Sequence, residues 1–161
     1  MDETSGIMKA MALEKLLFLK SYPLFGEFTD SDLETLEPLA KIKKWDDVEP
    51  LFNENDPTDG IYFLRSGRVQ IFQAVPKEKD ITIAMVEAGS PVGEIGLADG
   101  LPRTASARTL GRGSAAFISL ADYTRLEADQ PGVAVKIVKV ILQVMSARLR
   151  EFTGKMFSVN K

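Results

Sequence analysis

The 161-residue sequence predicts a mainly β domain, a sandwich or barrel of short antiparallel strands, with helices at both ends. Between residues 41 and 119, apolar and polar residues alternate in short runs that turn signals separate. No helical pattern comes between these runs, which argues against a parallel sheet. The segments 8–40 and 120–155 show helical spacing instead. With 45% apolar residues, we expect residues 1–161 to form a single domain around one core.

The N-terminal segment 8–40 predicts two helices. Over residues 8–20 the apolar side chains recur at helical spacing, as Met8, Met11, Ala12, Leu16 and Leu19. A second helix begins where the hydroxyl of Thr29 or Ser31 can cap it and continues to about Ala40. We expect Pro38 to distort its last turn.

The segment 41–119 predicts the β-roll. Strands are expected at residues 42–45, 51–52, 60–64, 68–73, 81–86, 105–110 and 114–119. Ser66-Gly67 and residues 111–113 are turns between strands, and the charged residues 76–80 are a loop tip. A glycine-rich loop over residues 92–106 interrupts the series.

The segment 120–155 predicts two further helices. Ser119 can cap a short helix, and Pro131 lies in the first turn of a long last helix that continues to about Phe152, with Gly154 near its end. One stripe of this last helix is apolar and consists of Val135, Val138, Ile141, Leu142, Met145 and Leu149. Two interpretations stay open: the stripe packs on the domain's own barrel, or it forms a homodimer seam with a second copy of the chain.

Composition excludes several kinds of chemistry. The sequence has no cysteine and no histidine, which excludes disulfides, thiol nucleophiles, Ser-His catalysis and the common zinc sites. We therefore expect no enzyme and no metal, although carboxylate-based hydrolysis stays formally open. The N-terminus is acidic, unlike a signal peptide, and no uncharged stretch is long enough to span a membrane, so we expect a cytoplasmic protein.

Charge argues against nucleic-acid binding over the whole surface, because the net charge is −3. The segment 131–161 is nevertheless basic. It either meets an acidic partner or is simply the solvated face of a helix.

The loop 92–106 carries the residues best suited to bind a ligand. Gly93-Glu94 opens a tight turn in which backbone N–H groups can converge on an anion. Arg103 adds a planar fork of donors that suits a phosphate. Since the carboxylate of Glu94 would repel an anion, a sugar hydroxyl is its natural partner. The loop thus predicts a site for a ribose joined closely to one phosphate, the alternative being an ordinary surface ion pair.

A specific family resemblance rests on two runs in this loop, Gly93-Glu94-Ile95-Gly96-Leu97 and Pro102-Arg103-Thr104-Ala105-Ser106. They resemble the phosphate-binding cassette of the cyclic nucleotide-binding domain family, which includes catabolite activators and protein kinase A regulatory subunits. Val92 stands where that family has an aromatic residue. The resemblance extends from about Leu24 to Phe152 and implies a double-stranded β-helix, or jelly roll, of eight strands.

A second family signature is similar to residues 51–67. Val48 and Asn55 stand where the family has glycines. Because asparagine tolerates the left-handed conformation better than other non-glycine residues, we expect Asn55 to adopt it.

The resemblance implies a 3′,5′-cyclic mononucleotide as ligand, cAMP or cGMP, and no other cofactor. Arg103 would hold the exocyclic phosphate oxygen, and Glu94 would accept from the ribose 2′-hydroxyl. Backbone N–H groups around Ile95, Gly96, Leu97 and Ala105 would complete the cradle. In some relatives the threonine at the position of Thr104 contacts guanine, and in others it contacts the phosphate. We favour cAMP slightly.

The family also closes its site with the last helix. By approximate alignment, Arg148, Phe152 and Thr153 are the candidates for this lid, although Phe152 fits a core or dimer contact equally well. The helix after Pro131 is then expected to change position or order when ligand binds.

Two alternatives to a ligand sensor follow from the same resemblance. One is a ligand-free interaction scaffold of the same fold, whose sign would be a missing Glu or Arg in the cassette; Glu94 and Arg103 are both present. The other is the sensor part of a transcription regulator. Only eight residues follow Thr153, so we expect no helix-turn-helix DNA-binding domain in this chain. The sequence does not identify a downstream protein partner.

Overall fold

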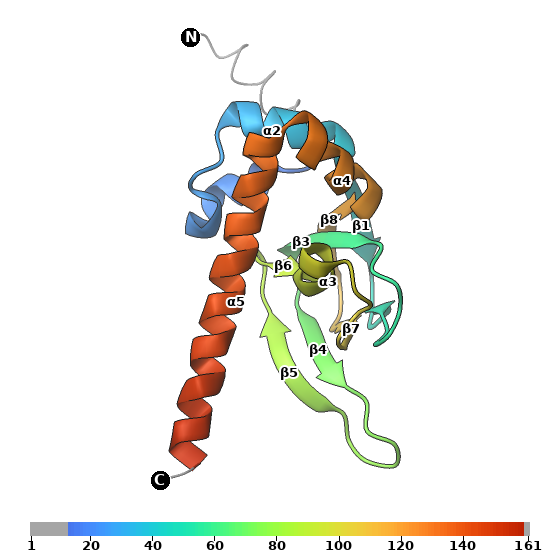
Figure 1. Ribbon diagram of the computed structural model, residues 1–161. Helices are drawn as coiled ribbons and strands as arrows, with labels where there is room; N and C mark the ends of the chain where they lie inside the picture. Colours follow the sequence, from blue (N-terminus) through green and yellow to red (C-terminus); the bar gives the residue numbers. More distant parts are fainter. Residues whose placement is uncertain (1–12, 160–161) are drawn as a thin grey trace.

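The computed structural model describes residues 13–159, and its centre is a roll of two antiparallel four-stranded sheets (Figure 1). One sheet has the strand order β1-β8-β3-β6 and the other β2-β7-β4-β5. The strands are β1 (Lys41–Trp45), β2 (Pro50–Phe52), β3 (Gly60–Ser66), β4 (Val69–Gln73), β5 (Ile81–Val86), β6 (Pro91–Val92), β7 (Ser106–Thr109) and β8 (Gly113–Ser119). The prediction of a mainly β jelly roll with flanking helices is confirmed. The sequence analysis missed β6, a two-residue strand too short to show alternation.

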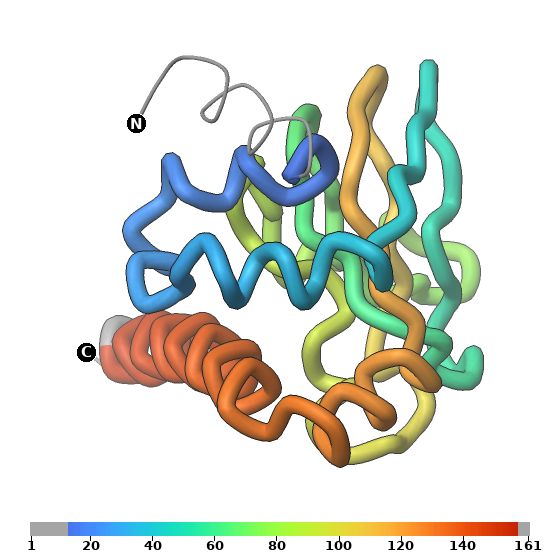
Figure 2. The backbone as a smooth tube through the Cα atoms, turned by 90° about the horizontal axis from the view of Figure 1, so that it is seen from above, coloured from blue at the N-terminus to red at the C-terminus, as the bar shows by residue number. Residues whose placement is uncertain are grey.

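The strand β3 lies between two hydrophobic clusters, which explains why it is buried on both faces. Ile61 and Phe63 point to a cluster shared with the helices, whereas Tyr62 and Leu64 point into the space between the sheets. Because successive side chains of a strand alternate in direction, one strand serves both clusters. Figure 2 shows the helices gathered on one side of the roll. Their buried residues share one cluster with Ile61 and Phe63.

The N-terminal helices differ in part from the prediction. Residues 8–12 lie outside the described residues, and Leu17–Ser21 is a 3₁₀-helix, η1, rather than an α-helix. Of the apolar residues in this segment, Leu13, Leu16 and Leu19 are buried, and only Leu19 of these lies within η1. A second 3₁₀-helix, η2 (Pro23–Phe25), follows.

The helix α2 (Asp30–Leu36) begins as the sequence predicts. Thr29 is its N-cap, and its hydroxyl accepts from the backbone N of Asp32 in a reciprocal capping box. The helix then narrows into the 3₁₀-helix η3 (Glu37–Leu39), which contains Pro38. The expected distortion of the last turn is confirmed.

The C-terminal helices are α4 (Leu120–Asp129), capped by Ser119, and α5 (Pro131–Val159). The predicted end of α5 near Phe152 is wrong. Gly154 does not stop the helix, because a glycine inside a helix costs only about 1 kcal/mol and no proline follows it here. No helix within residues 13–159 combines the length and hydrophobicity that crossing a membrane requires.

The face of α5 that packs on the domain is not the predicted stripe. The buried residues of this helix are Val133, Ala134, Ile137, Val140 and Ile141. Of the predicted stripe only Ile141 is among them, and Val135, Val138, Leu142, Met145 and Leu149 are exposed. The interpretation that this stripe packs on the chain's own barrel is therefore right for Ile141 and wrong for the other five residues.

The segment predicted as a glycine-rich loop contains a short helix, α3 (Glu94–Asp99), between two left-handed glycines, Gly93 and Gly100. A single turn and a half of helix has too few residues to show a period, so the sequence pattern could not reveal it. Asn55 is left-handed, as expected, with φ of 71°. Val48, at the other replaced glycine, is exposed and has no positive φ.

Candidate functional site

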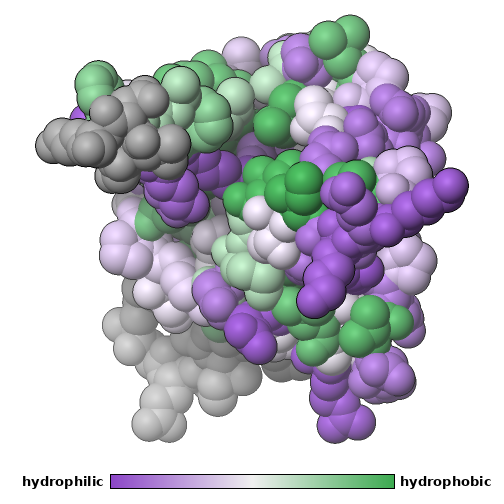
Figure 3. Space-filling model, turned by 90° about the horizontal axis from the view of Figure 1, so that it is seen from below, coloured by the Kyte–Doolittle hydropathy of each residue, from purple (hydrophilic) through white to green (hydrophobic). Residues whose placement is uncertain are grey.

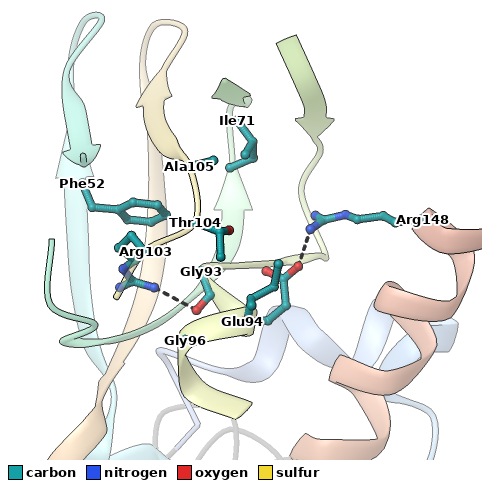
Figure 4. Close-up of a pocket in the computed structure, with 10 residues that line it drawn as sticks. Phe52, Ile71, Gly93, Glu94, Gly96, Arg103, Thr104, Ala105 and Arg148 are labelled. Carbon is teal, nitrogen blue, oxygen red and sulfur yellow. Dashed lines mark hydrogen bonds and ion pairs between the residues drawn. The ribbon is translucent and has the colours of Figure 1, made fainter. Parts of the chain in front are cut away.

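The cassette encloses a cavity of about 40 Å³ at the start of α3, between β4, the segment before β7, and α5 (Figure 4). A cavity of this size holds a few water molecules. Its walls are Phe52, Ile71, Gly93, Glu94, Ile95, Gly96, Arg103, Thr104, Ala105 and Arg148. Residues from four separate parts of the chain therefore meet here.

Gly93 sets the direction of α3. Its φ is 81°, and an added Cβ would overlap the Nη1 atom of Arg103, so only glycine fits the position. At Gly96, an added Cβ would overlap the side chain of Thr58. No side chain of the described residues caps the N-terminus of α3, so its first backbone N–H groups lack that partner.

Arg103 is 3% exposed and is held by the chain's own acceptors. Its Nη1 donates to Gly93 O at 2.8 Å, and its Nη2 donates to Asp59 Oδ1 and Gly60 O, each at 2.8 Å. The guanidinium also stacks on the ring of Phe52, with 4.1 Å between Cζ and the ring centroid. The chain's own contacts thus fix the position of the Arg103 guanidinium.

One donor of Arg103 remains unused. Its Nε is buried and has no hydrogen-bond partner among residues 13–159. A buried unpaired donor costs free energy, and an anionic oxygen would remove that cost. The Asp59 side chain that shares the positive charge is 67% exposed, so water screens this ion pair and leaves part of the charge for another anion.

The aromatic wall beside Arg103 continues into the core. The ring of Tyr62 lies next to that of Phe52, with 6.4 Å between centroids. Burial raises the pKa of Tyr62, the charge of Asp59 raises it further, and Arg103 opposes them. Tyr62 therefore stays a neutral phenol and adds no negative charge to the site.

Glu94, the carboxylate of the cassette, is 2% exposed and does not face water. It accepts a hydrogen bond from Nη1 of Arg148, which reaches over from α5. Figure 4 shows the two side chains pointing at one another. A buried carboxylate needs such a partner, since removing one member of the pair leaves an uncompensated charge.

Most of the predicted site residues meet at this cavity. Gly93, Glu94, Ile95, Gly96, Arg103, Thr104, Ala105 and the lid candidate Arg148 line it. Leu97 does not: its side chain packs in the core with the helices. The other lid candidates also lie elsewhere, since Phe152 lines a neighbouring groove and the Thr153 hydroxyl donates to Leu149 O.

Sequence reasoning missed three contributors, Phe52, Ile71 and Asp59. The alternation of β4 places Ile71 on the same face as the buried Val69, a signal that could have marked Ile71 as inward-facing. Nothing in the sequence places Phe52 or Asp59 against Arg103, because these contacts depend on how β2, β3 and the cassette meet.

A wider groove lies next to this cavity, between β5 and the second half of α5. Its volume is about 890 Å³. Its walls are Thr82, Ile83, Ala84, Met85, Val86, Glu87 and Ser90 on one side, and Val144, Ala147, Arg148, Leu149, Glu151, Phe152 and Lys155 on the other. Arg148 borders both spaces.

Comparison with known proteins gives one family. The family model for the cyclic nucleotide-binding domain matches residues 42–129, more than half of the chain. The crystal structure of a cyclic nucleotide-binding domain from Methylobacillus flagellatus is 27% identical, with a TM-score of 0.78, and the match covers 93% of this chain and 84% of that one.

Two curated relatives come from Mycobacterium tuberculosis. A CRP-like cAMP-activated global transcriptional regulator is 29% identical over 62% of this chain and 43% of its own. An uncharacterized NTE family protein is 27% identical over 83% of this chain and 21% of its own. This chain thus spans less than half of the length of either relative.

Proposed function

Because the chain belongs to the cyclic nucleotide-binding domain family, we propose that it binds a 3′,5′-cyclic mononucleotide at the cavity beside α3 and acts as a regulatory module rather than an enzyme. One observation carries this proposal. A fixed, buried arginine with an unpaired Nε lies at the uncapped start of α3, and a buried carboxylate lies beside it. Donors for one phosphate and an acceptor for one sugar hydroxyl are therefore within a single cavity.

The phosphate would take the donors that the chain leaves unused. We assign its exocyclic oxygen to Arg103, whose Nε is free to donate, and the remaining contacts to backbone N–H groups of Ile95, Gly96, Leu97 and Ala105. Leu97 would contribute its backbone alone, since its side chain is in the core. Charge-assisted hydrogen bonds of this kind are the stronger ones, particularly in a site that excludes water.

The ribose would compete with Arg148 for Glu94. The carboxylate that would accept from the 2′-hydroxyl is bound to Arg148 in the structure, and the enclosed space is too small for a nucleotide beside that pair. Ligand entry would therefore move Arg148, and with it the part of α5 that carries it. The ligand can shift the equilibrium between the two positions of α5 only by the difference between its affinities for the chain in each position.

We favour cAMP over cGMP as the ligand, with the base at the mouth of the cavity. Thr104 is exposed there, and its backbone O accepts from Nε2 of Gln73. Phe152 and Thr153 would approach the base only after α5 moves, because neither lines the cavity in the structure.

The test is titration calorimetry of the chain with cAMP and with cGMP, using Arg103→Lys. A lysine keeps the charge but cannot donate from the position of Nε, so we expect affinity to fall at least about tenfold. Arg108→Lys is the matched control. Arg108 also stacks on a phenyl ring at 4.1 Å and pairs with an aspartate, Asp80, but lies outside the cavity.

Equal losses of affinity in the two variants would show that Arg103 does not bind the phosphate. A folded parent that gives no heat with either nucleotide would favour the second candidate, a ligand-free interaction scaffold. The observation in favour of that candidate is the Glu94–Arg148 pair, by which the chain already satisfies its own cassette carboxylate.

A further inference from the structure

Gln73 is a polar side chain at the end of a strand whose inward-facing side chains are otherwise apolar. On β4, Val69 is buried in the cluster between the sheets, and Ile71 lines the cavity of the cassette. Because successive side chains of a strand alternate in direction, Gln73 lies on the same face as Ile71, nearer the end of the hairpin. A polar amide therefore follows an apolar row beside the cavity.

One hydrogen bond fixes which way the Gln73 amide points. Its Nε2 donates to the backbone O of Thr104 at 2.7 Å, and Thr104 lines the cavity. A carbonyl oxygen accepts and cannot donate, so the NH₂ end of the amide must face it. The amide group of Gln73 therefore lies at the edge of the cavity in a single orientation, just outside the walls.

Two hydrogen-bonding groups of this amide remain for a ligand. The Oε1 atom of Gln73 has no partner among residues 13–159, and the second N–H of its Nε2 is also unused. Together they form one acceptor and one donor in a fixed order. Such a pair matches the edge of a base that presents a donor next to an acceptor.

The base of a nucleotide bound at the cassette would extend past the cavity. With the phosphate on Arg103 and the ribose on Glu94, the enclosed volume of about 40 Å³ leaves no room for a base. The adjoining space is the groove between β5 and α5, whose walls include Ala84, the cross-strand partner of Ile71. Figure 3 shows hydrophobic side chains on the face where the end of α5 and the β4–β5 hairpin lie. Apolar walls suit the flat faces of a base and leave its edge to a few polar groups.

We propose that Gln73 is a specificity-determining residue that selects adenine. Its Oε1 accepts from the 6-amino group of the base, and its Nε2 donates to the neighbouring ring nitrogen. Adenine presents this donor and this acceptor side by side. A guanine in the same place would set its 6-oxygen against Oε1, and the bond to Thr104 holds the amide against turning over. This role rests on the proposed function, because it needs a cyclic nucleotide in the cavity.

Two other polar side chains near the mouth of the cavity are less selective. A threonine hydroxyl donates or accepts by rotation, so that of Thr104 accommodates either base. The guanidinium of Arg148 only donates, and it is bound to Glu94 in the structure. Of these side chains, Gln73 alone offers an acceptor and a donor in a fixed order.

Titration calorimetry with a pair of ligands tests this role. The pair is cAMP and 3′,5′-cyclic purine riboside monophosphate, which lacks only the 6-amino group. We expect the parent to bind cAMP at least about tenfold more tightly than the analogue. We expect Gln73→Met to bind the two about equally, because methionine has a similar length but only a weak acceptor.

Gln70→Met is the matched control. Gln70 lies on the opposite face of the same strand, where its amide bonds to Arg108 and Thr82. This variant should keep the preference of the parent for cAMP.

The possible outcomes separate the role of Gln73 from the proposed function. A folded parent that binds neither ligand contradicts both. A parent that binds both ligands equally, or a preference for cAMP that survives Gln73→Met, contradicts the role of Gln73 alone. The comparison of the two ligands on the parent needs no substitution, so it decides the matter even where a variant does not fold.

Discussion

At the scale of single residues, Gly93 links the fold of the cassette to its cavity. It is the N-cap of α3, with φ of 81°, and its carbonyl oxygen accepts from Arg103. The absence of a Cβ is what allows the guanidinium to lie against the backbone at this point. The position of Arg103, and with it the unused Nε donor, depends on this glycine.

We predict that Gly93→Ala lowers the free energy of unfolding by about 2–3 kcal/mol, because alanine adds both a strained left-handed backbone and a clash with Arg103. Urea denaturation measures this loss. Gly100→Ala is the control, since Gly100 is also left-handed but an added Cβ there has nothing within 4 Å. It should lose only the backbone part, about 1 kcal/mol. Similar losses at both positions would show that the contact with Arg103 is unimportant.

Asn55 and Val48 show how two replaced glycines are accommodated differently. Asn55 keeps the left-handed backbone, and its N–H donates to Arg103 O at 2.9 Å, so it helps to position the cassette. Val48 lies on the surface without a positive φ. Of the two positions, the left-handed backbone is therefore present at Asn55, which contacts Arg103, and not at Val48.

At the scale of elements, α5 is tied to the rest of the domain by ion pairs along its length. Lys136 pairs with Asp32 of α2, Lys139 with Glu27, and Arg148 with Glu94. The first two ties hold the N-terminal half of α5 to the N-terminal helices, and the third holds its middle to the cassette. A ligand that bound Glu94, as we propose, would remove the third tie and leave the other two.

The tie between α5 and α2 makes stability depend on pH. Burial by itself would raise the pKa of Asp32, but hydrogen bonds from Lys136 and Thr29 outweigh it, so the pKa lies below its ordinary value. A lowered pKa in the folded state stabilises the fold above the pKa of the unfolded state, and this stability is lost as pH falls through the folded value. The window is therefore below about pH 4.

We predict that Asp32→Asn destabilises the chain by about 1–2 kcal/mol near neutral pH, and that its difference from the parent shrinks below about pH 4, where the parent's carboxylate also becomes neutral. Denaturant titrations at several pH values measure this. Glu34→Gln, on the exposed side of the same helix, controls for loss of charge. A difference that is constant from pH 7 to about pH 3 would contradict the assignment.

At the scale of the whole molecule, the roll and the second half of α5 differ in how many buried contacts they make. The two sheets are held by a shared core, whereas residues 142–157 of α5 contribute no side chain to either buried cluster. Regions with few buried contacts open at the lowest free-energy cost. A ligand in the cavity would therefore be sensed first by the second half of this helix.

We predict that cAMP changes amide hydrogen exchange in about residues 144–155 and leaves residues 133–141 nearly unchanged, because the core contacts of the first half persist. Mass spectrometry of exchanged peptides resolves the two halves. Arg148→Met, which removes the tie to Glu94 without ligand, should reproduce part of the change. Identical exchange with and without cAMP, in a chain that binds it, would show that α5 does not respond.

Some of this architecture follows from the sequence because the signals are local. The strands show alternation over consecutive residues, the capping box needs only Thr29 and Asp32, and the cassette residues from Gly93 to Ala105 are close in the chain. The kind of fold and most of the walls of the cavity could therefore be predicted.

Other features were decided by the tertiary structure alone, because they arise from contacts between residues far apart in the chain. Which stripe of α5 is buried depends on where α2 and the sheet lie, and an apolar pattern looks the same whether its partner is the domain or a second copy. The pairing of Glu94 with Arg148 joins residues 54 positions apart. The sequence named both as site residues, but only the fold made each the partner of the other, because their distance depends on the path of the whole intervening chain.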